Sequence, residues 1–243
     1  MHISVRASEV SACIGRNKFK PASEVLDSLL KRHGLTHVKT KEDKAQDIIS
    51  TLPAAQAAYQ RVLESRPTSS SGVQVVYEAA VKEVEKMDLK ADEKLKLMDH
   101  FRGSAYTSHG IRKENTTALQ TKLNLVEDHA MYRLPLCKLG NNVYTLCGKI
   151  DRIETTLDGK KILVEIKNRT KTLFHKVYQE EMIQVQTYLQ MLDMEDAKLI
   201  EQYNSEINTM PITRDRRFWE EEILPGLIQF CEAAQVRFLA EAA

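Results

Sequence analysis

Three charged residues near the middle of the chain have the types and spacing that phosphodiester hydrolysis requires. Asp151 falls late in one predicted strand, and Glu165 and Lys167 fall in the next one. Side chains alternate across a strand, so Glu165 and Lys167 share a face. Clustered carboxylates are the oxygen ligands that Mg²⁺ or Mn²⁺ prefers. A cation bound there would polarise a phosphate and activate a water molecule, which Lys167 could orient or help deprotonate.

The hairpin that joins these residues sets a geometric condition for the site. Positions 151 and 165 are symmetric about residue 158, which lies in the predicted turn 157–160. A connection with an odd number of residues places Asp151 opposite Glu165 on one face of the sheet. A two-residue turn would shift the pairing by one and separate the two carboxylates. We therefore expect an odd or bulged connection if the carboxylates act together.

The strand that carries Glu165 and Lys167 has the apolar sequence Leu-Val-Glu-Ile-Lys, which indicates burial. Two carboxylates that face each other across strands repel, and a buried charge is costly without a partner. A divalent cation would remove this repulsion. A solvated strand face with a cross-strand ion pair is the alternative interpretation of the same spacing. Burial of the strand favours the metal site.

Helices are predicted to surround this hairpin. Apolar spacing and the positions of Gly, Pro and Ser predict them over 8–14, 21–33, 42–51, 54–65, 73–84, 92–101, 107–125 and 176–192, with a helical tail from Arg214 that is kinked at Pro225. Strands are predicted over 129–137, 143–154, 162–167 and 197–203. Together they predict an α/β (α+β) fold, in which a central mixed β-sheet is flanked by helices and the N-terminal region is helical.

Length and composition are those of an ordinary globular protein. The 243 residues suffice for a single domain over 1–243, with a helical insertion predicted at about 35–103. A net charge of +1 does not indicate nucleic-acid binding, although a local basic groove is compatible with it. No apolar run approaches a membrane span, and the N-terminal sequence lacks the features of a signal peptide. We expect an intracellular protein of the cytoplasm or nucleus, with no membrane partner and no secretion.

Five short segments carry polar residues in a characteristic order along the chain. They are Arg6-Ala7-Ser8-Glu9-Val10, His109-Gly110-Ile111-Arg112-Lys113-Glu114-Asn115, Gly148-Lys149-Ile150-Asp151, Glu165-Ile166-Lys167 and Gln184-Val185-Gln186-Thr187-Tyr188. In this order they resemble motifs of phage lambda exonuclease and its YqaJ-like viral recombinase relatives, within the PD-(D/E)XK nuclease superfamily. The resemblance covers most of the chain outside about 35–103 and implies a restriction-endonuclease-like core. One departure is Ile150, which stands where the superfamily has the proline of its name.

The resemblance implies a role for each matched residue of the active site. Asp151 and Glu165 would bind the metal together with the main-chain carbonyl of Ile166. Glu114 would lie close to the metal, directly or through water. Lys167 would be the catalytic lysine, and Gln184 would hydrogen-bond near the scissile phosphate. By themselves, Glu114 and Gln184 are more often surface residues.

A second set of residues is expected to contact DNA. Ser8 matches a position that the family associates with the DNA end, and Arg6 is added because of its charge and proximity. Arg169 and Lys171 belong to the basic cluster nearest to the predicted site, where phosphate contacts are expected. Tyr188 lies in the motif that begins at Gln184. The ordinary structural alternatives are a helix N-cap for Ser8, a solvated face for the basic cluster and a core aromatic for Tyr188.

The resemblance implies a Mg²⁺- or Mn²⁺-dependent exonuclease that degrades linear double-stranded DNA from 5′ to 3′ in recombination, repair or end processing. It also implies a virus- or phage-encoded homo-oligomer, with a trimer as the candidate, that works with a single-strand annealing protein. A structure- or sequence-specific endonuclease on the same core is the first alternative. A non-catalytic DNA-binding scaffold is the second, and the intact set Glu114, Asp151, Glu165 and Lys167 argues against it.

Overall fold

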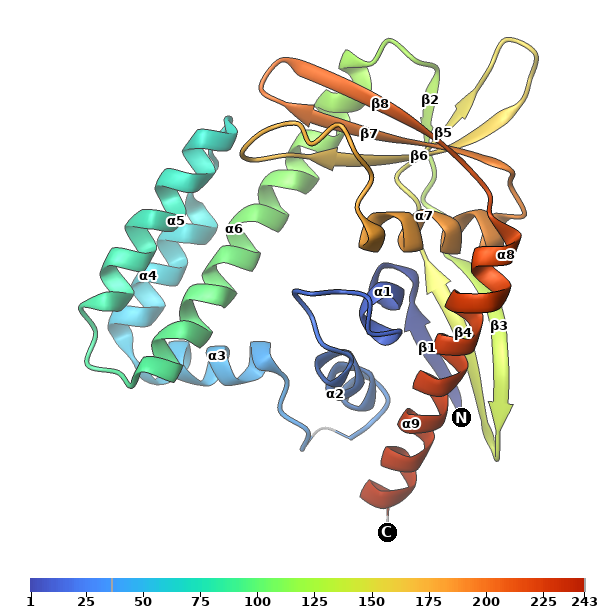
Figure 1. Ribbon diagram of the computed structural model, residues 1–243. Coiled ribbons are helices and arrows are strands. Elements are labelled where there is room, and N and C mark those ends of the chain that lie inside the picture. Colours follow the sequence, from blue (N-terminus) through green and yellow to red (C-terminus); the bar gives the residue numbers. More distant parts are fainter. Residues whose placement is uncertain (36, 243) are drawn as a thin grey trace.

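In this computed structural model, which describes residues 1–35 and 37–242, the chain forms two mixed sheets (Figure 1). The larger sheet has the strand order β2-β5-β6-β7-β8. Its strands are β2 (Leu125–Glu127), β5 (Arg152–Thr155), β6 (Lys161–Asn168), β7 (Asp196–Tyr203) and β8 (Glu206–Thr213). β6 and β7 run parallel, and the other neighbouring pairs run antiparallel.

The smaller sheet has the order β1-β4-β3. Its strands are β1 (His2–Arg6), β4 (Asn142–Gly148) and β3 (Tyr132–Leu139). The prediction of one strand over 143–154 in one central sheet was wrong, because the chain leaves β4 at Gly148 and enters the larger sheet as β5. A Cβ atom on Gly148 would lie 2.7 Å from the Tyr188 ring and 2.9 Å from the Ala7 side chain. Only glycine permits this close approach at the point where the chain changes sheets.

Helices pack against both sheets, which confirms the predicted architecture of mixed strands flanked by helices (Figure 1). The helices of this body are η1 (Ala7–Glu9), α1 (Val10–Cys13), α2 (Ala22–Arg32), α7 (Gln179–Leu192), α8 (Arg216–Phe218) and α9 (Leu224–Ala242). α7 belongs to two hydrophobic cores. Its residue Ile183 packs in the core that contains β1 and β4, and Leu189 packs in the core that contains β6 and β7. This helix therefore fixes the two sheets relative to each other.

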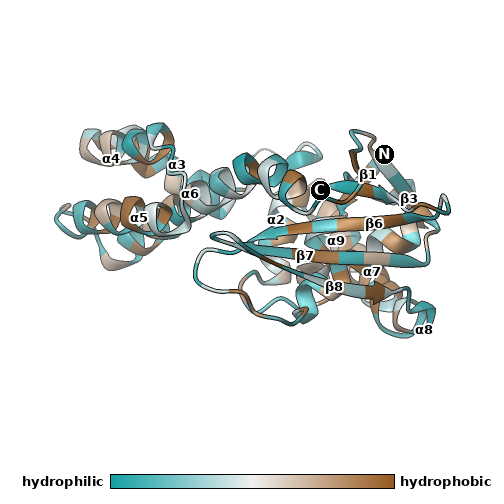
Figure 2. Ribbon diagram, turned by 90° about the horizontal axis from the view of Figure 1, so that it is seen from above, coloured by the Kyte–Doolittle hydropathy of each residue, from teal (hydrophilic) through white to brown (hydrophobic). Residues whose placement is uncertain are grey.

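A helical arm extends to one side of the sheets when the molecule is seen from above (Figure 2). It consists of α3 (Lys41–Thr51), α4 (Pro53–Glu64), α5 (Ser70–Glu85) and the first half of α6 (Ala91–Gln120). The arm has a hydrophobic core of its own, in which Val73, Leu97 and Phe101 are 0% exposed. The predicted helices over 42–51 and 54–65 agree with α3 and α4 to within one residue. The assignment of 35–103 as an insertion in one domain stays a prediction.

α6 is one continuous helix of 30 residues, where the sequence predicted two helices over 92–101 and 107–125. Gly103 lies inside it and destabilises the helix by about 1 kcal/mol relative to alanine, because glycine has a low helix propensity. Leu97, Phe101 and Ala105 recur every fourth residue and are buried in the arm, which favours continuation of the helix. The first half of α6 therefore belongs to the arm, and the second half packs against β6 of the larger sheet.

The C-terminal region contains one strand that was not predicted, and the predicted kink at Pro225 stays a prediction. β8 was not predicted, because its sequence alternates weakly and contains Pro211. A π-helical segment, Trp219–Ile223, directly precedes α9. Pro225 lacks the N–H group that a regular helix would use, so the ladder of hydrogen bonds is rearranged before it. Within the described residues, no helix is both long and apolar enough to cross a membrane.

Candidate active site

The β5–β6 hairpin has the register that paired carboxylates require. Arg152 pairs with Val164, and the connection 156–160 has an odd number of residues. The same register, continued by one residue, sets Asp151 opposite Glu165. The expected odd connection is thus confirmed, and the two carboxylates lie on one face of the hairpin.

Burial disfavours two negative charges in this position. Glu165 is 3% exposed, and its Oε2 atom has no hydrogen-bond partner within the described residues. Asp151 accepts a hydrogen bond from the N–H group of Ile166 at 2.8 Å. Burial, and then the negative charge of Glu165, raise the pKa of Asp151 to about 8. The pair therefore favours a shared proton or a bound cation.

Lys167 and Gln184 converge on the same carboxylate. The Nζ atom of Lys167 donates hydrogen bonds to Glu165 Oε1 at 2.7 Å and to Gln184 Oε1 at 3.2 Å. Gln184 in turn donates from Nε2 to Glu165 Oε1 at 3.0 Å. Burial lowers the pKa of Lys167, but the charge of Glu165 and their hydrogen bond outweigh burial, so the pKa is raised. Lys167 is thus a cation whose side chain remains 25% exposed towards the site.

The oxygen atoms of this site fit a divalent cation. Glu165 Oε2 is a buried carboxylate oxygen that no hydrogen bond of the described residues satisfies, and a cation would lower the raised pKa of Asp151. The main-chain carbonyl of Ile166 would add a third oxygen. In the described part of the chain, no three or more His, Cys, Asp or Glu side chains are arranged as a metal cluster. The candidate donor set would be two carboxylates and one carbonyl, a number compatible with Mg²⁺, which usually retains several waters.

A cavity of about 460 Å³ opens over these residues, between α6 and β6. Asn168, at the end of β6, fixes the two elements to each other. It accepts a hydrogen bond from Thr117 Oγ1 at 2.6 Å and donates one to the carbonyl of Gly110 at 3.0 Å. Sequence analysis did not single out Asn168, although it directly follows Lys167. The attachment positions the second half of α6 along one wall of the cavity.

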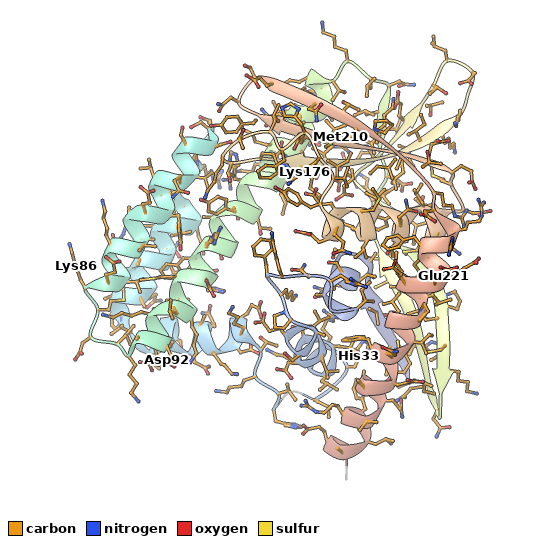
Figure 3. The ribbon with its side chains drawn as sticks, viewed as in Figure 1. His33, Lys86, Asp92, Lys176, Met210 and Glu221 are labelled. Atoms are coloured by element: carbon orange, nitrogen blue, oxygen red, sulfur yellow. The ribbon has the colours of Figure 1, made fainter. Side chains whose placement is uncertain are left out.

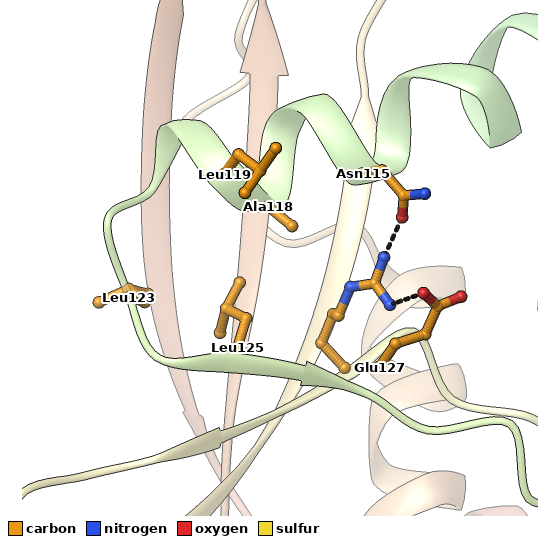
Figure 4. A pocket seen from close by; sticks show the side chains of 7 residues that line it. Asn115, Ala118, Leu119, Leu123, Leu125 and Glu127 are labelled. Carbon is orange, nitrogen blue, oxygen red and sulfur yellow. Dashed lines mark hydrogen bonds and ion pairs between the residues drawn. The ribbon is translucent and has the colours of Figure 1, made fainter.

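Arg152 links α6 to β2 through Asn115 and Glu127 (Figure 4), and it also pairs with Glu114. The guanidinium is 4% exposed, forms ion pairs with Glu127 at 3.0 Å and Glu114 at 3.5 Å, and donates a hydrogen bond to Asn115. Burial raises the pKa of Glu114, Arg152 opposes this shift, and Glu165 adds to it. Glu114 therefore lies within electrostatic range of the pair but is bound to arginine. Arg152 was not predicted as a site residue, although a cation within a buried strand requires a partner.

The residues that were predicted to contact DNA differ in their exposure. Arg6, Ser8 and Lys171 are exposed. Ser8 lies inside η1 and does not cap a helix, since the N-cap position is Arg6. Tyr188 is 4% exposed and its ring packs against Gly148, which is the core position named as the alternative, and its contact with DNA stays a prediction.

Arg169 is engaged in ion pairs within the protein. Its guanidinium binds both carboxylate oxygens of Glu181, at 2.6 and 3.2 Å, and its Nε atom donates to Glu201 at 3.0 Å. The side chain is 11% exposed and lines the cavity. Arg169 is therefore paired with two acids within the protein, and its phosphate contact stays a prediction. Glu201 was missed, although a lone acid within an apolar strand is the same signal that identified Glu165.

Comparisons with known proteins give structural likenesses alone. No family model matches this chain, and no curated protein matches it. A phage-related exonuclease from Haemophilus somnus 129PT is 13% identical, with 100% of this chain and 98% of that chain covered and a TM-score of 0.45. The alkaline exonuclease LHK-Exo from Laribacter hongkongensis is 14% identical, with 78% and 93% covered and a TM-score of 0.40. The protein SSO0001 is 17% identical, with 74% and 84% covered and a TM-score of 0.42. Because these TM-scores are low, the function is derived from the site itself.

Proposed function

We propose that the protein is a metal-dependent deoxyribonuclease that hydrolyses phosphodiester bonds at the ends of linear double-stranded DNA. One observation carries the proposal: Glu165, buried opposite Asp151, keeps one oxygen without a partner among the described residues, while Lys167 binds the other. Such an arrangement is costly in a structural ion pair and useful in a site that receives a cation. It lines a cavity of about 460 Å³ that is open to substrate.

Each residue has a defined task in this proposal. Asp151, Glu165 and the carbonyl of Ile166 would hold Mg²⁺ or Mn²⁺, which when bound polarises the phosphate and lowers the pKa of a coordinated water. Lys167 orients the attacking water and stabilises the negative charge that develops on the phosphate. Gln184 holds both Lys167 and the fixed oxygen of Glu165, so the two groups keep their positions.

The test uses three DNA substrates with the wild-type protein and two variants. Linear duplex, covalently closed circle and linear single strand are incubated with Mg²⁺ or Mn²⁺. We expect loss of the linear duplex alone, and a decrease of roughly 10²- to 10⁴-fold in both Glu165→Ala and Lys167→Ala. Cleavage of the circle would replace the exonuclease by the endonuclease alternative. Full activity in both variants would refute the site, and no cleavage of any substrate would favour a DNA-binding scaffold.

Finer properties of the proposal rest on the motif resemblance. Degradation from 5′ to 3′ is tested with a duplex labelled at one 5′ end, where single nucleotides carrying the label should be released first. A homo-oligomer, with a trimer as the candidate, is tested by light scattering on the purified chain. Action with a single-strand annealing protein, in recombination, repair or end processing, would require that such a protein binds this chain directly.

A further inference from the structure

Two loops meet beside the candidate active site. One loop, 14–21, joins α1 to α2, and the other, 169–178, joins β6 to α7 (Figure 1). Aromatic rings and lysines of the two loops lie together. We call this set the aromatic–basic patch, and its members are Lys18, Phe19, Phe174, Lys176 and Tyr178.

The rings and ammonium groups of the patch are in direct contact. Lys18 Nζ lies 4.9 Å from the centre of the Phe19 ring and 5.8 Å from that of Tyr178, so one lysine bridges the loops. Lys176 Nζ lies 4.8 Å from the Tyr178 ring. The rings of Phe174 and Tyr178 meet edge to face at 5.1 Å. These residues leave aromatic surface exposed, since Phe19 is 74% and Phe174 is 36% exposed.

Hydrogen bonds hold both loops in place. Asn17 Oδ1 accepts from the N–H groups of Phe19 at 2.9 Å and Lys20 at 3.0 Å, which fixes Phe19 at the tip of a turn. In the second loop, Glu201 accepts from the N–H groups of Phe174 at 3.1 Å and His175 at 2.7 Å. His175 has φ +53°, a strained conformation that persists because these bonds maintain it. The exposed rings are therefore preorganised.

The charge of the patch is available to a ligand. Among the ion pairs of the described residues, none contains Lys18, Lys171 or Lys176. The acidic neighbours Glu181 and Glu201 both pair with Arg169 and not with these lysines. A surface with exposed rings and unpaired lysines is complementary to a polyanion that also offers flat apolar faces. Unpaired nucleotides have this combination, whereas the bases of a duplex already stack on each other.

Arg169 connects the patch to the active-site cavity. Its guanidinium carbon lies 4.6 Å from the centre of the Phe174 ring, and the same side chain lines the cavity that contains Glu165 and Lys167. We propose that the aromatic–basic patch binds the unpaired nucleotides of a single strand, by stacking of bases on the rings and by contacts of Lys18 and Lys176 with phosphates. The assignment deepens the proposed nuclease function and rests on it for the direction of the strand into the cavity.

Binding is measured by fluorescence anisotropy of labelled oligo(dT) and of a blunt duplex, without divalent cation so that no hydrolysis occurs. Phe19→Leu keeps an apolar side chain and removes the ring, and Phe19→Trp keeps a ring. We expect Phe19→Leu to weaken oligo(dT) binding roughly 5- to 100-fold, with recovery in Phe19→Trp and little change for the blunt duplex. Phe19 is so exposed that its replacement leaves the fold intact, which the melting temperature checks.

A matched pair of lysines tests the electrostatic part. Lys176 lies on the 169–178 loop, and Lys86 lies at the far end of the arm (Figure 3). Lys176→Ala should reduce the slope of log affinity against log salt for oligo(dT) by about 0.7, the value for one phosphate of a single strand. Lys86→Ala should leave the slope unchanged.

Three results would overturn the assignment. They are unchanged oligo(dT) affinity in a Phe19→Leu/Phe174→Leu double variant, equal weakening for oligo(dT) and blunt duplex, and an identical salt slope in Lys176→Ala and wild type. These outcomes are independent of hydrolysis. Weakened strand binding by Phe19→Leu in a protein that cleaves no DNA would retain the patch and refute the nuclease. Cleavage that depends on Glu165, together with any of the three results, would retain the nuclease and refute the patch.

Discussion

Glu165 and Glu201 lie on the neighbouring strands β6 and β7 and are both almost fully buried, yet their surroundings differ. Glu201 is 0% exposed, and both of its carboxylate oxygens accept hydrogen bonds, from two main-chain N–H groups of the 169–178 loop and from two side chains. Glu165 is 3% exposed, and its hydrogen bonds are confined to one oxygen. The hydrogen bonds of Glu201 therefore occupy both of its oxygens, whereas one oxygen of Glu165 can still accept a ligand.

The pKa directions follow this difference. Burial acts to raise the pKa of Glu201, but the N–H groups of Phe174 and His175 outweigh burial, so the pKa is lowered. For Asp151, opposite Glu165, burial and the neighbouring charge act together and raise the pKa to about 8. Burial of a carboxylate is therefore not by itself a sign of function. Two features distinguish the candidate active site from a structural acid. One carboxylate oxygen has no hydrogen-bond partner among the described residues, and a second carboxylate lies beside it.

The largest expected effect is on catalysis at Glu165. Glu165→Gln should reduce hydrolysis of linear duplex by roughly 10³-fold, about 4 kcal/mol, because it removes a cation ligand but retains the shape of the side chain. The melting temperature should fall less than in a Glu201→Gln variant, since the loss of a buried charge with an unsatisfied oxygen offsets the loss of the ion pair with Lys167. Rates and melting curves are measured on the same preparation. Equal rates in the variant and the wild type would remove Glu165 from the reaction.

Glu201→Gln should have the opposite profile. Replacement of the carboxylate leaves Arg169 with one anionic partner and weakens the N–H bonds of the loop, so we expect a loss of about 3 kcal/mol of unfolding free energy. Urea denaturation gives this value directly. Hydrolysis per folded molecule should fall less than in Glu165→Gln. A variant with a wild-type denaturation midpoint would show that Glu201 does not organise the loop.

The raised pKa of Asp151 predicts a pH dependence of stability in the absence of divalent cations. A carboxyl group with a folded-state pKa of about 8 stabilises the fold fully below its unfolded-state pKa of 3.8, and this contribution is lost as the pH rises to about 8. Asp151→Asn should therefore gain stability relative to wild type over this range, on the order of 2 kcal/mol at its upper end. Mg²⁺ should remove most of the difference. Parallel stability curves for the two proteins would contradict the assigned pKa.

The smallest effect is expected at Glu114, because its carboxylate is already paired with Arg152. Glu114→Gln should slow hydrolysis about tenfold, about 1.4 kcal/mol, through its influence on the charge of the site. Glu127→Gln, which changes the other acidic partner of Arg152, is the control and should have a lesser effect. A loss in Glu114→Gln as large as that in Glu165→Gln would instead indicate that Glu114 is a direct metal ligand.

Local sequence signals predicted the chemical centre and much of the arm. The symmetric positions of Asp151 and Glu165 about residue 158 implied an odd hairpin connection, which the register of β5 and β6 confirms. Helices α3 and α4 were predicted to within one residue, because caps and prolines mark their ends. These features depend on residues close together in the sequence.

Features that depend on distant contacts were missed. The division into two sheets depends on Gly148 packing against Tyr188, a residue 40 positions later. The continuity of α6 through Gly103 depends on burial of Phe101 in the arm. The helix propensities of the residues around Gly103 do not predict this burial. Arg152 was overlooked because its partners come from α6, which was predicted as two helices, and from β2, which was not predicted. In each of these features, packing between residues distant in the sequence overrode the local conformational preference.

The most direct test of the comparison is a titration with Mn²⁺, in which the electron paramagnetic resonance signal of the free ion reports how much is bound. Wild-type protein and the Glu165→Gln and Glu201→Gln variants are compared under conditions where all three are folded. We predict binding by the wild type, similar binding by Glu201→Gln, and at least roughly tenfold weaker binding by Glu165→Gln, since one of two carboxylate ligands is lost. Equal affinity in all three proteins, or no binding by the wild type, would contradict the assignment of Asp151 and Glu165 as a metal site.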